Sequence, residues 1–396
     1  MIVPVTRFGS KGCAMKSILA LLFSCFFSLQ LAFAQAPSAG DQRFTEWMAN
    51  YYVYKDVYER PDNSGTAEFL KWLDESKMLE RHPGGFQSSV AFLTIVFQQN
   101  PSRVETWARN QNYSGRAQQA IKYALWLSGN GNLIATIFND NPEFAKAKPV
   151  SLLDWRLRQP GDLDMMWSSF SASGNVTYVK KIIDVLDESN SLTGNEAADK
   201  LTRAAAQWSL GANMMQHELV NRLIRREIGA RTGAIKTKLE EIVTRNEQAM
   251  KPFPNRDGEF QAMLVVIDEK ALAEFEKPSN QGMNFTAASK IKLGDTIAIK
   301  IVFAGMQLAD DLMANVTFDM KIVEPDGTVD PKGDVKNLQA LQARMPMRFR
   351  VFDNRSFVKL HFDPASKLGK YKIVAEVRDN IGARKVALEQ VVELTE

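Results

Sequence analysis

Three tryptophans recur at one fixed interval along this chain. Trp126, Trp167 and Trp208 follow one another every 41 residues, and each precedes a small or polar break and then an apolar stretch. An aromatic residue, a break and an amphipathic helix at constant period are typical of stacked helical repeats, in which each helix pair buries its open face on the next. The period therefore predicts an α-solenoid. It favours tryptophans packed between repeats over a row of exposed rings that would bind carbohydrate.

A second motif repeats at the same interval. The segment 97–101 reads Phe-Gln-Gln-Asn-Pro, and the segment 138–142 reads Phe-Asn-Asp-Asn-Pro. Asparagine ends helices well and the following proline can open the next segment, so this echo predicts matching helix ends. One period before Trp126 lies Gly85, next to Phe86, which gives about four units with an atypical first one.

The helical pattern extends over residues 41–250. Its first stripe places aromatic residues three or four apart, which predicts an amphipathic helix that covers the start of the array, with a ligand groove as the alternative. The stripe consists of Phe44, Trp47, Met48, Tyr51, Tyr52 and Tyr54. Further helices are expected at 69–79, 86–99, 162–170, 176–186, 200–209 and 217–244. The last of these carries a basic cluster, Arg222, Arg225, Arg226 and Arg231, interpreted as a solvated face rather than an anion site.

Residues 251–260 form the expected linker, because two prolines and a glycine interrupt the helical pattern there. Over 261–396 the apolar period changes from 3.6 to 2, which predicts an antiparallel β-sandwich. A short helix is expected at 268–277 and a turn at 324–327. Strands are expected at 263–267, 296–303, 315–323, 348–352, 357–362, 371–377 and 385–392.

Two segments of this second half resemble immunoglobulin-like domains of bacterial exported proteins. Residues 322–327 contain a Pro-Asp-Gly turn that leaves a strand, and residues 363–379 contain Gly369-Lys-Tyr371 at the start of a late strand. The resemblance implies an immunoglobulin-like fold with Tyr371 packed into the sandwich. The cysteine pair and the tryptophan of antibody domains have no counterpart here. The helical half is similar in period to HEAT and TPR repeats, but it lacks the TPR consensus. The predicted fold class is thus α+β, with a helical-repeat domain followed by the sandwich.

Residues 1–34 have the pattern of a cleavable signal peptide. A cationic start at Met15-Lys16-Ser17 precedes an almost unbroken apolar run, and Ala32-Phe33-Ala34 is a small-x-small cleavage site. Met15 is accordingly interpreted as the true start, and cleavage is expected after Ala34. The alternatives are an uncleaved anchor and a lipoprotein attached through Cys25. A periplasmic or secreted protein is the expected product.

Both cysteines, Cys13 and Cys25, lie in this leader, so the mature chain would lack disulfides, thiolate chemistry and cysteine-bound metals. The leader also holds three of the 49 basic residues and no acid, which leaves the remainder charge-balanced against 46 acids. A balanced chain gives no sign of a nucleic-acid partner. No apolar run long enough to span a membrane follows the leader.

Residues that could support chemistry are few and scattered. The three histidines, His82, His217 and His361, lie in different predicted regions, and no zinc, nucleophile-elbow, phosphate-loop or dinucleotide motif occurs. The carboxylate pair Asp162/Asp164 suits a helix start, and Asp310/Asp311 suits a loop. No catalytic, cofactor-binding or metal-binding residue is therefore predicted. The alternative is a Cu(I) site in the β half, where thioethers gather with His361. These methionines are Met283, Met306, Met313, Met320, Met345 and Met347.

The function predicted from these patterns is a non-enzymatic binding or scaffolding protein of the cell envelope. Helical repeats offer long surfaces without a catalytic pocket, and β-sandwiches serve as spacers or docking modules. The expected partner is a protein or another envelope component. The competing hypothesis is an envelope hydrolase whose scattered residues meet in an interdomain cleft.

Overall fold

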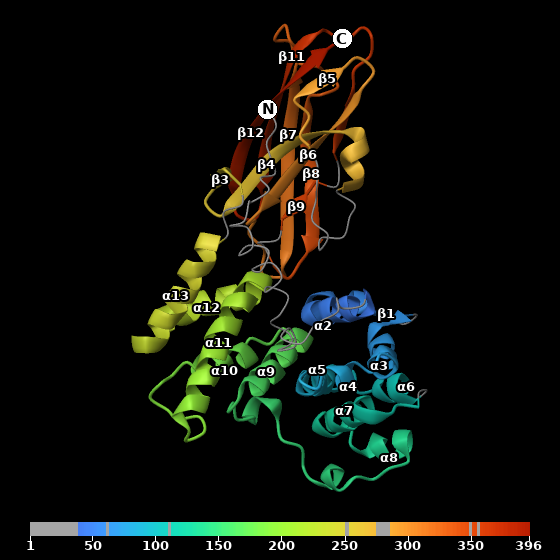
Figure 1. The fold of residues 1–396 in the computed structure, drawn as a ribbon, viewed down its shortest axis with the longest axis vertical. Helices are drawn as coiled ribbons and strands as arrows, with labels where there is room; N and C mark the ends of the chain where they lie inside the picture. The colour runs from blue at the N-terminus through green and yellow to red at the C-terminus, as the bar shows by residue number, and fades with distance from the viewer. Residues whose placement is uncertain are drawn as a thin grey trace. The chain divides into compact units, whose positions relative to one another are not determined.

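The computed structural model describes residues 39–60, 63–109, 112–249, 253–274, 286–347, 351–354 and 357–396. Packing divides these residues into two compact units (Figure 1). The helical unit ends at Asn246, and the β unit starts at Glu247. The predicted signal peptide, Cys13 and Cys25 lie outside the described residues.

The helical unit is built mainly from α-helices. They are α2 (Ala39–Tyr58), α3 (Gly65–Glu75), α4 (Met78–Arg81), α5 (Gly85–Gln99), α6 (Val104–Arg109), α7 (Gly115–Leu127), α8 (Asn132–Phe138), α9 (Pro160–Ser173), α10 (Thr177–Asp184), α11 (Glu196–Gln216), α12 (Glu218–Ala230) and α13 (Gly233–Ala249). Two 3-10 turns, η2 (Glu143–Lys146) and η3 (Leu152–Asp154), and a small ladder of β1 (Glu59–Arg60) and β2 (Asn63–Ser64) complete it.

The predicted helix end at Asn100 is confirmed, because Asn100 caps the C-terminus of α5. The matching end at Asn141 is wrong by two residues, since α8 ends at Phe138 and Asn139 caps it in the left-handed conformation. Gly174 ends α9 with φ 71°, which a glycine adopts without strain. Two predicted helices are each split in the structure. Residues 69–79 break after Glu75, and residues 217–244 break between α12 and α13.

Helix α5 lies at the centre of the helical core. All its residues from Ser88 to Phe97 are buried. It packs against α7 and against α9, and α9 also packs against α2 (Figure 1). Small side chains, Ser89 and Ala91 on α5 and Ser168 and Ala172 on α9, are all buried. Because α5 and α9 are separated by three helices in sequence, this packing differs from a stack in which each unit touches only the next.

The β unit contains two five-stranded sheets. Its elements are β3 (Asn255–Asp257), β4 (Phe260–Asp268), η4 (Glu269–Glu274), β5 (Lys290–Lys292), β6 (Thr296–Ala304), β7 (Met313–Val323), β8 (Val335–Arg344), β9 (Phe352–Asp353), β10 (Val358–His361), β11 (Gly369–Asp379) and β12 (Arg384–Thr395). One sheet has the order β10-β6-β4-β3 with β9 beside β6, and the other has the order β5-β12-β11-β7-β8. Contacts of β12 with β4 and β3 join the two sheets.

The prediction of a wholly antiparallel β half is wrong at one pair, because β5 runs parallel to β12. The other pairings between the described strands of these two sheets are antiparallel. The predicted turn is confirmed, since the Gly327 N–H donates to the Glu324 carbonyl oxygen at 2.9 Å. Tyr371 at the start of β11 is buried and packs edge-on against Phe362, with ring centroids 5.1 Å apart.

Strand β6 has an alternating apolar sequence, but its residues are buried on both faces of the sheet. The predicted inward residues of β6, such as Ile297 and Phe303, are buried. Ala298 and Val302 on the opposite face of β6 are buried too, because Leu272 of η4 and Phe357 pack against them. Strand β6 is therefore covered on both faces, although its sequence alternates.

Candidate functional site

Helix α11 begins at a strongly fixed loop. The Asn195 side chain caps it by accepting hydrogen bonds from the Ala197 and Ala198 N–H groups. Asp199 on the first turn binds back to the preceding loop, accepting from the Thr193 hydroxyl at 2.6 Å and from the Leu192 N–H at 2.9 Å. The Thr193 hydroxyl and the other donors lower the pKa of Asp199 to about 2. The helix therefore starts from a well-defined position.

One side of α11 is held by the rest of the helical unit. Ala206, Leu210 and Met214 are buried, and α11 packs against α9, α10 and α12. Helix α13 borders it near Gly211, whose carbonyl oxygen accepts a hydrogen bond from the Asn246 amide at 2.8 Å.

The opposite side of α11 is exposed and apolar. With 3.6 residues per turn, seven residues share a sector of about 100°, and none of them carries a polar side chain. These residues, called the α11 face below, are Ala197, Leu201, Ala204, Ala205, Trp208, Ala212 and Met215. All are exposed or half-buried, with 63% of Leu201 and 45% of Trp208 exposed. Gly211 lies at the edge that α13 covers. The face extends about 27 Å along the helix.

The three periodic tryptophans occupy three different environments. Trp167, in the middle of α9, is 1% exposed and confirms the prediction of a core residue. Trp126 lies in the last turn of α7, half-buried, and its indole N–H donates to the Ala147 carbonyl oxygen at 2.7 Å. For Trp208 the prediction of a buried seam is wrong, since the residue belongs to the α11 face. The helices and connections between these three tryptophans differ in length. Equal spacing in sequence therefore does not put the three residues in equivalent structural environments.

Arginines of the basic cluster on α12 are bonded to acceptor side chains four residues earlier in the chain. The Arg222 Nε donates to Glu218 at 3.0 Å, and the Arg225 Nε donates to the Asn221 side chain at 3.0 Å. Arg231 binds Glu227 at 2.9 Å. Acceptors along the same helix thus engage these guanidinium groups, which favours the interpretation as a solvated face.

The histidines do not converge. His217 lies in the single-residue break between α11 and α12, 1% exposed, with its Nδ1 3.2 Å from the Tyr52 hydroxyl. Burial lowers the pKa of His217 to about 3, so the ring is a neutral packing group at physiological pH. His82 follows α4, and His361 on β10 lies 3.0 Å from the Thr296 hydroxyl. Among the described residues, no group of three or more His, Cys, Asp or Glu side chains could hold a metal ion.

The carboxylate pairs have structural partners. Asp162 is buried at the start of α9 and accepts hydrogen bonds from the Arg158 and Gln159 N–H groups, so the predicted helix-start role is confirmed. Asp311 lies in the loop between β6 and β7 and accepts from the Met313 N–H at 3.1 Å.

The methionines suggested for Cu(I) do not all lie within reach of one ion. Met306, Met320 and Met345 are buried apolar residues. Met313 and Met320 both lie on β7, seven residues apart, which corresponds to about 23 Å of extended strand. One ion could not reach both thioethers. Met283 lies outside the described residues.

The aromatic stripe of α2 is mainly core. Phe44, Trp47 and Tyr51 are buried, and Trp47 stacks on Phe69 with ring centroids 5.0 Å apart. A polar hollow of about 560 Å³ opens beside Tyr51 and includes Lys55, Arg60 and Arg103. The carboxylate in its wall, Glu59, is engaged by the Tyr51 and Ser64 hydroxyls and by the Thr66 N–H. These contacts anchor the ladder of β1 and β2.

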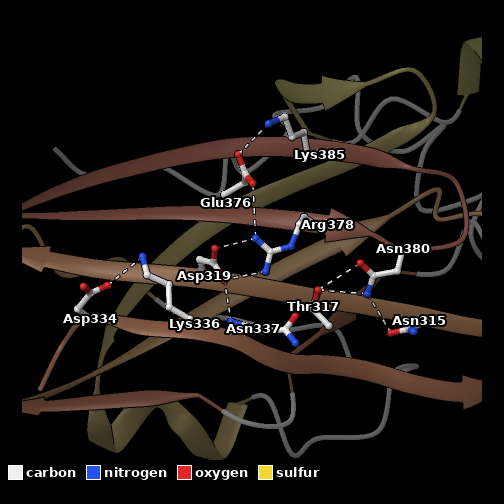
Figure 2. A network of polar contacts seen from close by, with 10 residues as sticks. All are labelled: Asn315, Thr317, Asp319, Asp334, Lys336, Asn337, Glu376, Arg378, Asn380 and Lys385. Atoms are coloured by element: carbon white, nitrogen blue, oxygen red, sulfur yellow. Dashed lines mark hydrogen bonds and ion pairs between the residues drawn. The ribbon is translucent and has the colours of Figure 1, made fainter.

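A polar network covers one face of the second sheet of the β unit (Figure 2). Arg378 on β11 forms a bidentate pair with Asp319 on β7, with distances of 2.8 and 2.7 Å. Asp319 also accepts the backbone N–H of Asn337 on β8 at 2.7 Å, and the Arg378 guanidinium holds the pKa of Asp319 near 2. On β12, Lys385 pairs with Glu376 at 3.3 Å. The network therefore ties four strands together, as a structural cross-strand device.

Within the described residues, no helix combines the length and apolar character needed to cross a bilayer. The chain matches no known family model and no curated protein sequence.

Weak likenesses to solved structures exist. One is a family 123 glycoside hydrolase from Clostridium perfringens, 13% identical with a TM-score of 0.21, over 35% of this chain and 27% of the hydrolase. The chain thus spans about a quarter of that enzyme's length. An alkylpurine DNA glycosylase from Pseudomonas fluorescens is also 13% identical, with a TM-score of 0.21 over 98% and 99% of the two chains. An immunoglobulin-like protein from Pseudomonas aeruginosa is 13% identical, with a TM-score of 0.17 over 37% and 99%. These scores are too low to assign a fold or an activity.

Proposed function

We propose that this protein is an exported, non-enzymatic binding protein of the cell envelope that contacts a protein partner through the α11 face. The observation that carries the proposal is an exposed helix face without one polar side chain, centred on Trp208. Contiguous apolar patches of this kind on monomers commonly mark protein contacts. Tryptophan is also enriched among the residues that dominate binding energy.

The size of the effect follows from the exposed side chains. Leu201 and Trp208 are 63% and 45% exposed, and a partner would remove this apolar surface from water. At about 25 cal/mol per Å² the gain is on the order of a few kcal/mol for the two residues together. The alanines around them present little side-chain entropy to lose and let a partner approach the backbone closely. The face thus suits another helix better than a flexible polar ligand.

The β unit supplies a second module in this proposal. Its two joined five-stranded sheets, the turn at 324–327 and the buried Tyr371 support an immunoglobulin-like sandwich. We assign it the role of a spacer or docking module. The polar network around Arg378 and Asp319 fits a solvated outer face rather than a reaction centre.

Site-specific photocrosslinking in intact cells tests the proposal. A photoreactive residue at Ala204 in the α11 face should give a defined crosslinked protein band, which Trp208→Ser should abolish. The matched control is Val57 on α2, which is 52% exposed but lies outside the α11 face. Equal labelling from both positions would contradict the proposal, as would turnover of a peptide or glycan by the purified protein. Recovery of the mature chain beginning at Gln35 from the periplasmic or secreted fraction tests export.

A further inference from the structure

The α11 face has an internal order of large and small residues. From its N-terminal end it reads Ala197, Leu201, the pair Ala204 and Ala205, Trp208, Ala212 and Met215. Each large side chain thus has a small one at a mirrored position about residue 206. Leu201 mirrors Ala212, Trp208 mirrors Ala204 and Ala205, and Met215 mirrors Ala197.

We infer that the partner of the α11 face is a second copy of this chain, packed antiparallel about a twofold axis that passes near residue 206. This inference rests on the proposed function, because it takes the α11 face as the binding surface. A twofold interface brings each residue i onto a residue j and the same j onto i, so a face must complement itself. In this arrangement Trp208 lies on the alanine pair of the other copy and Leu201 lies on Ala212. Large residues then fill the space over small ones, as close packing between helices requires.

A parallel arrangement of the two copies fits less well. It would set Trp208 against Trp208 and Leu201 against Leu201, with alanines facing alanines between them. The large pairs would hold the helices apart, and the small pairs would then enclose voids. The antiparallel order is therefore the one that the side-chain sizes favour.

Charge favours the same order. No charged side chain lies in the α11 face, so no ion loses its water in the contact. On α11 itself, the cation that flanks the face is Lys200, which pairs with Glu196 at 2.6 Å. About the twofold axis the two Lys200 residues lie about 19 Å apart along the helices, beyond the ~8 Å Debye length of physiological salt. A parallel pair would bring them side by side, and it would also align the two helix dipoles.

The size of the face sets the expected strength. One helix face of about 27 Å is smaller than the roughly 800 Å² per partner that stable interfaces bury. We therefore expect a reversible dimer with a dissociation constant in the micromolar range. Trp208 lies near its centre, so Trp208→Ser should weaken association by at least about 30-fold.

Disulfide trapping tests the arrangement. Expression from Gln35 removes Cys13 and Cys25, so single cysteines can be introduced into a chain without others. A mixture of Leu201→Cys and Ala212→Cys proteins should form a disulfide-linked dimer, because these positions face each other across the axis. Leu201→Cys alone should not, since its two copies lie about 16 Å apart along the helices. In a parallel pair Leu201→Cys alone would form the disulfide, and the mixture of Leu201→Cys and Ala212→Cys would form no disulfide between the two different proteins. That result would overturn the inference.

Sedimentation equilibrium between about 1 and 500 µM measures association without any cross-link. The unmodified chain should dimerise reversibly, and Trp208→Ser and Ala204→Glu should both raise the dissociation constant by at least about 30-fold, with circular dichroism spectra like that of the unmodified chain. Ala204→Glu retains the tryptophan and so guards against an effect of its loss on folding. A chain that stays monomeric at every concentration overturns the inference. If the chain is monomeric but a photoreactive residue at Ala204 still crosslinks to a different protein in cells, the dimer inference fails and the proposed function holds. If no such crosslink forms, both the dimer inference and the proposed function fail.

Discussion

At the scale of single residues, Trp167 and Trp208 form a natural pair of probes. They share residue type and helical setting, but Trp167 is 1% exposed and Trp208 is 45% exposed. Trp167→Ala should lower the free energy of unfolding by about 3–5 kcal/mol, because it leaves a large cavity beside Phe170. Trp208→Ala should cost about 1 kcal/mol or less. Urea denaturation at a concentration where the chain is monomeric measures both, and equal losses would contradict the assigned environments.

Trp167 and Trp208 also show which structural properties the 41-residue period can predict and which it cannot. Each of the three tryptophans lies in an α-helix, because helix signals are local, but the break expected after Trp208 is absent, since α11 continues to Gln216. Which face of a helix is buried depends on what packs against it, and that is a property of the whole unit. Trp208 carries no local mark that separates it from Trp167. The neighbouring Leu201 and the row of alanines on the same helix face indicate that the described part of the chain leaves α11 uncovered there.

At the scale of elements, His217 joins four helices. It connects α11 to α12, its Nδ1 faces the Tyr52 hydroxyl of α2, and its ring lies edge-on to Phe170 of α9. Burial raises the pKa of Tyr52 and lowers the pKa of His217 to about 3. An unfolded histidine takes up a proton near pH 6.5, whereas the folded one stays neutral until about pH 3.

Stability should therefore depend on pH through His217. Its contribution is fully present above pH 6.5 and is lost as the pH falls toward 3, because only the unfolded state binds the extra proton in that window. The slope is at most about 1.4 kcal/mol per pH unit. Urea midpoints at pH 7.5 and 5.5 measure it. His217→Gln should flatten the difference, whereas His361→Gln should keep it. An unchanged slope in His217→Gln would exclude this source.

Strand β8 marks the limit of prediction from local pattern. Residues 335–344 alternate poorly, and Leu338, Leu341 and Ala340 have the spacing of a helix rather than a strand. The segment nevertheless pairs with β7, through two register irregularities. Asn337 has φ 50° within β8, and Asp319 accepts its N–H. The conformation of β8 thus depends on the Asp319 carboxylate of β7. The sequence of residues 335–344 alone does not predict this contact.

At the scale of the whole molecule, the change of period near residue 251 predicts the change from helices to strands, because amphipathic periodicity reflects the secondary structure directly. The uneven distribution of tryptophan follows the same division. The seven tryptophans lie between Trp47 and Trp208, in the helical unit. Tryptophan fluorescence consequently reports the unfolding of the helical unit, while hydrogen exchange at the amides of the strands reports the unfolding of the β-structure.

Because the two units give different signals, the effect of a substitution on the unfolding of the β unit can be measured separately from the unfolding of the helical unit. Gly305 follows β6 with φ 73°, and a Cβ there would lie 1.9 Å from the Glu259 carbonyl oxygen. Gly305→Ala should therefore lower the free energy of unfolding of the β unit by roughly 3 kcal/mol or more, since backbone strain and a backbone overlap add. Gly294→Ala is the matched control, because Gly294 also has positive φ, 90°, but no atom lies within 4 Å of its Cβ position. It should cost about 1 kcal/mol, from strain alone. Urea unfolding followed by both signals separates the two variants. If Gly305→Ala shifted the tryptophan transition more than the β-structure transition, the assignment of Gly305 to the β-unit core would be wrong.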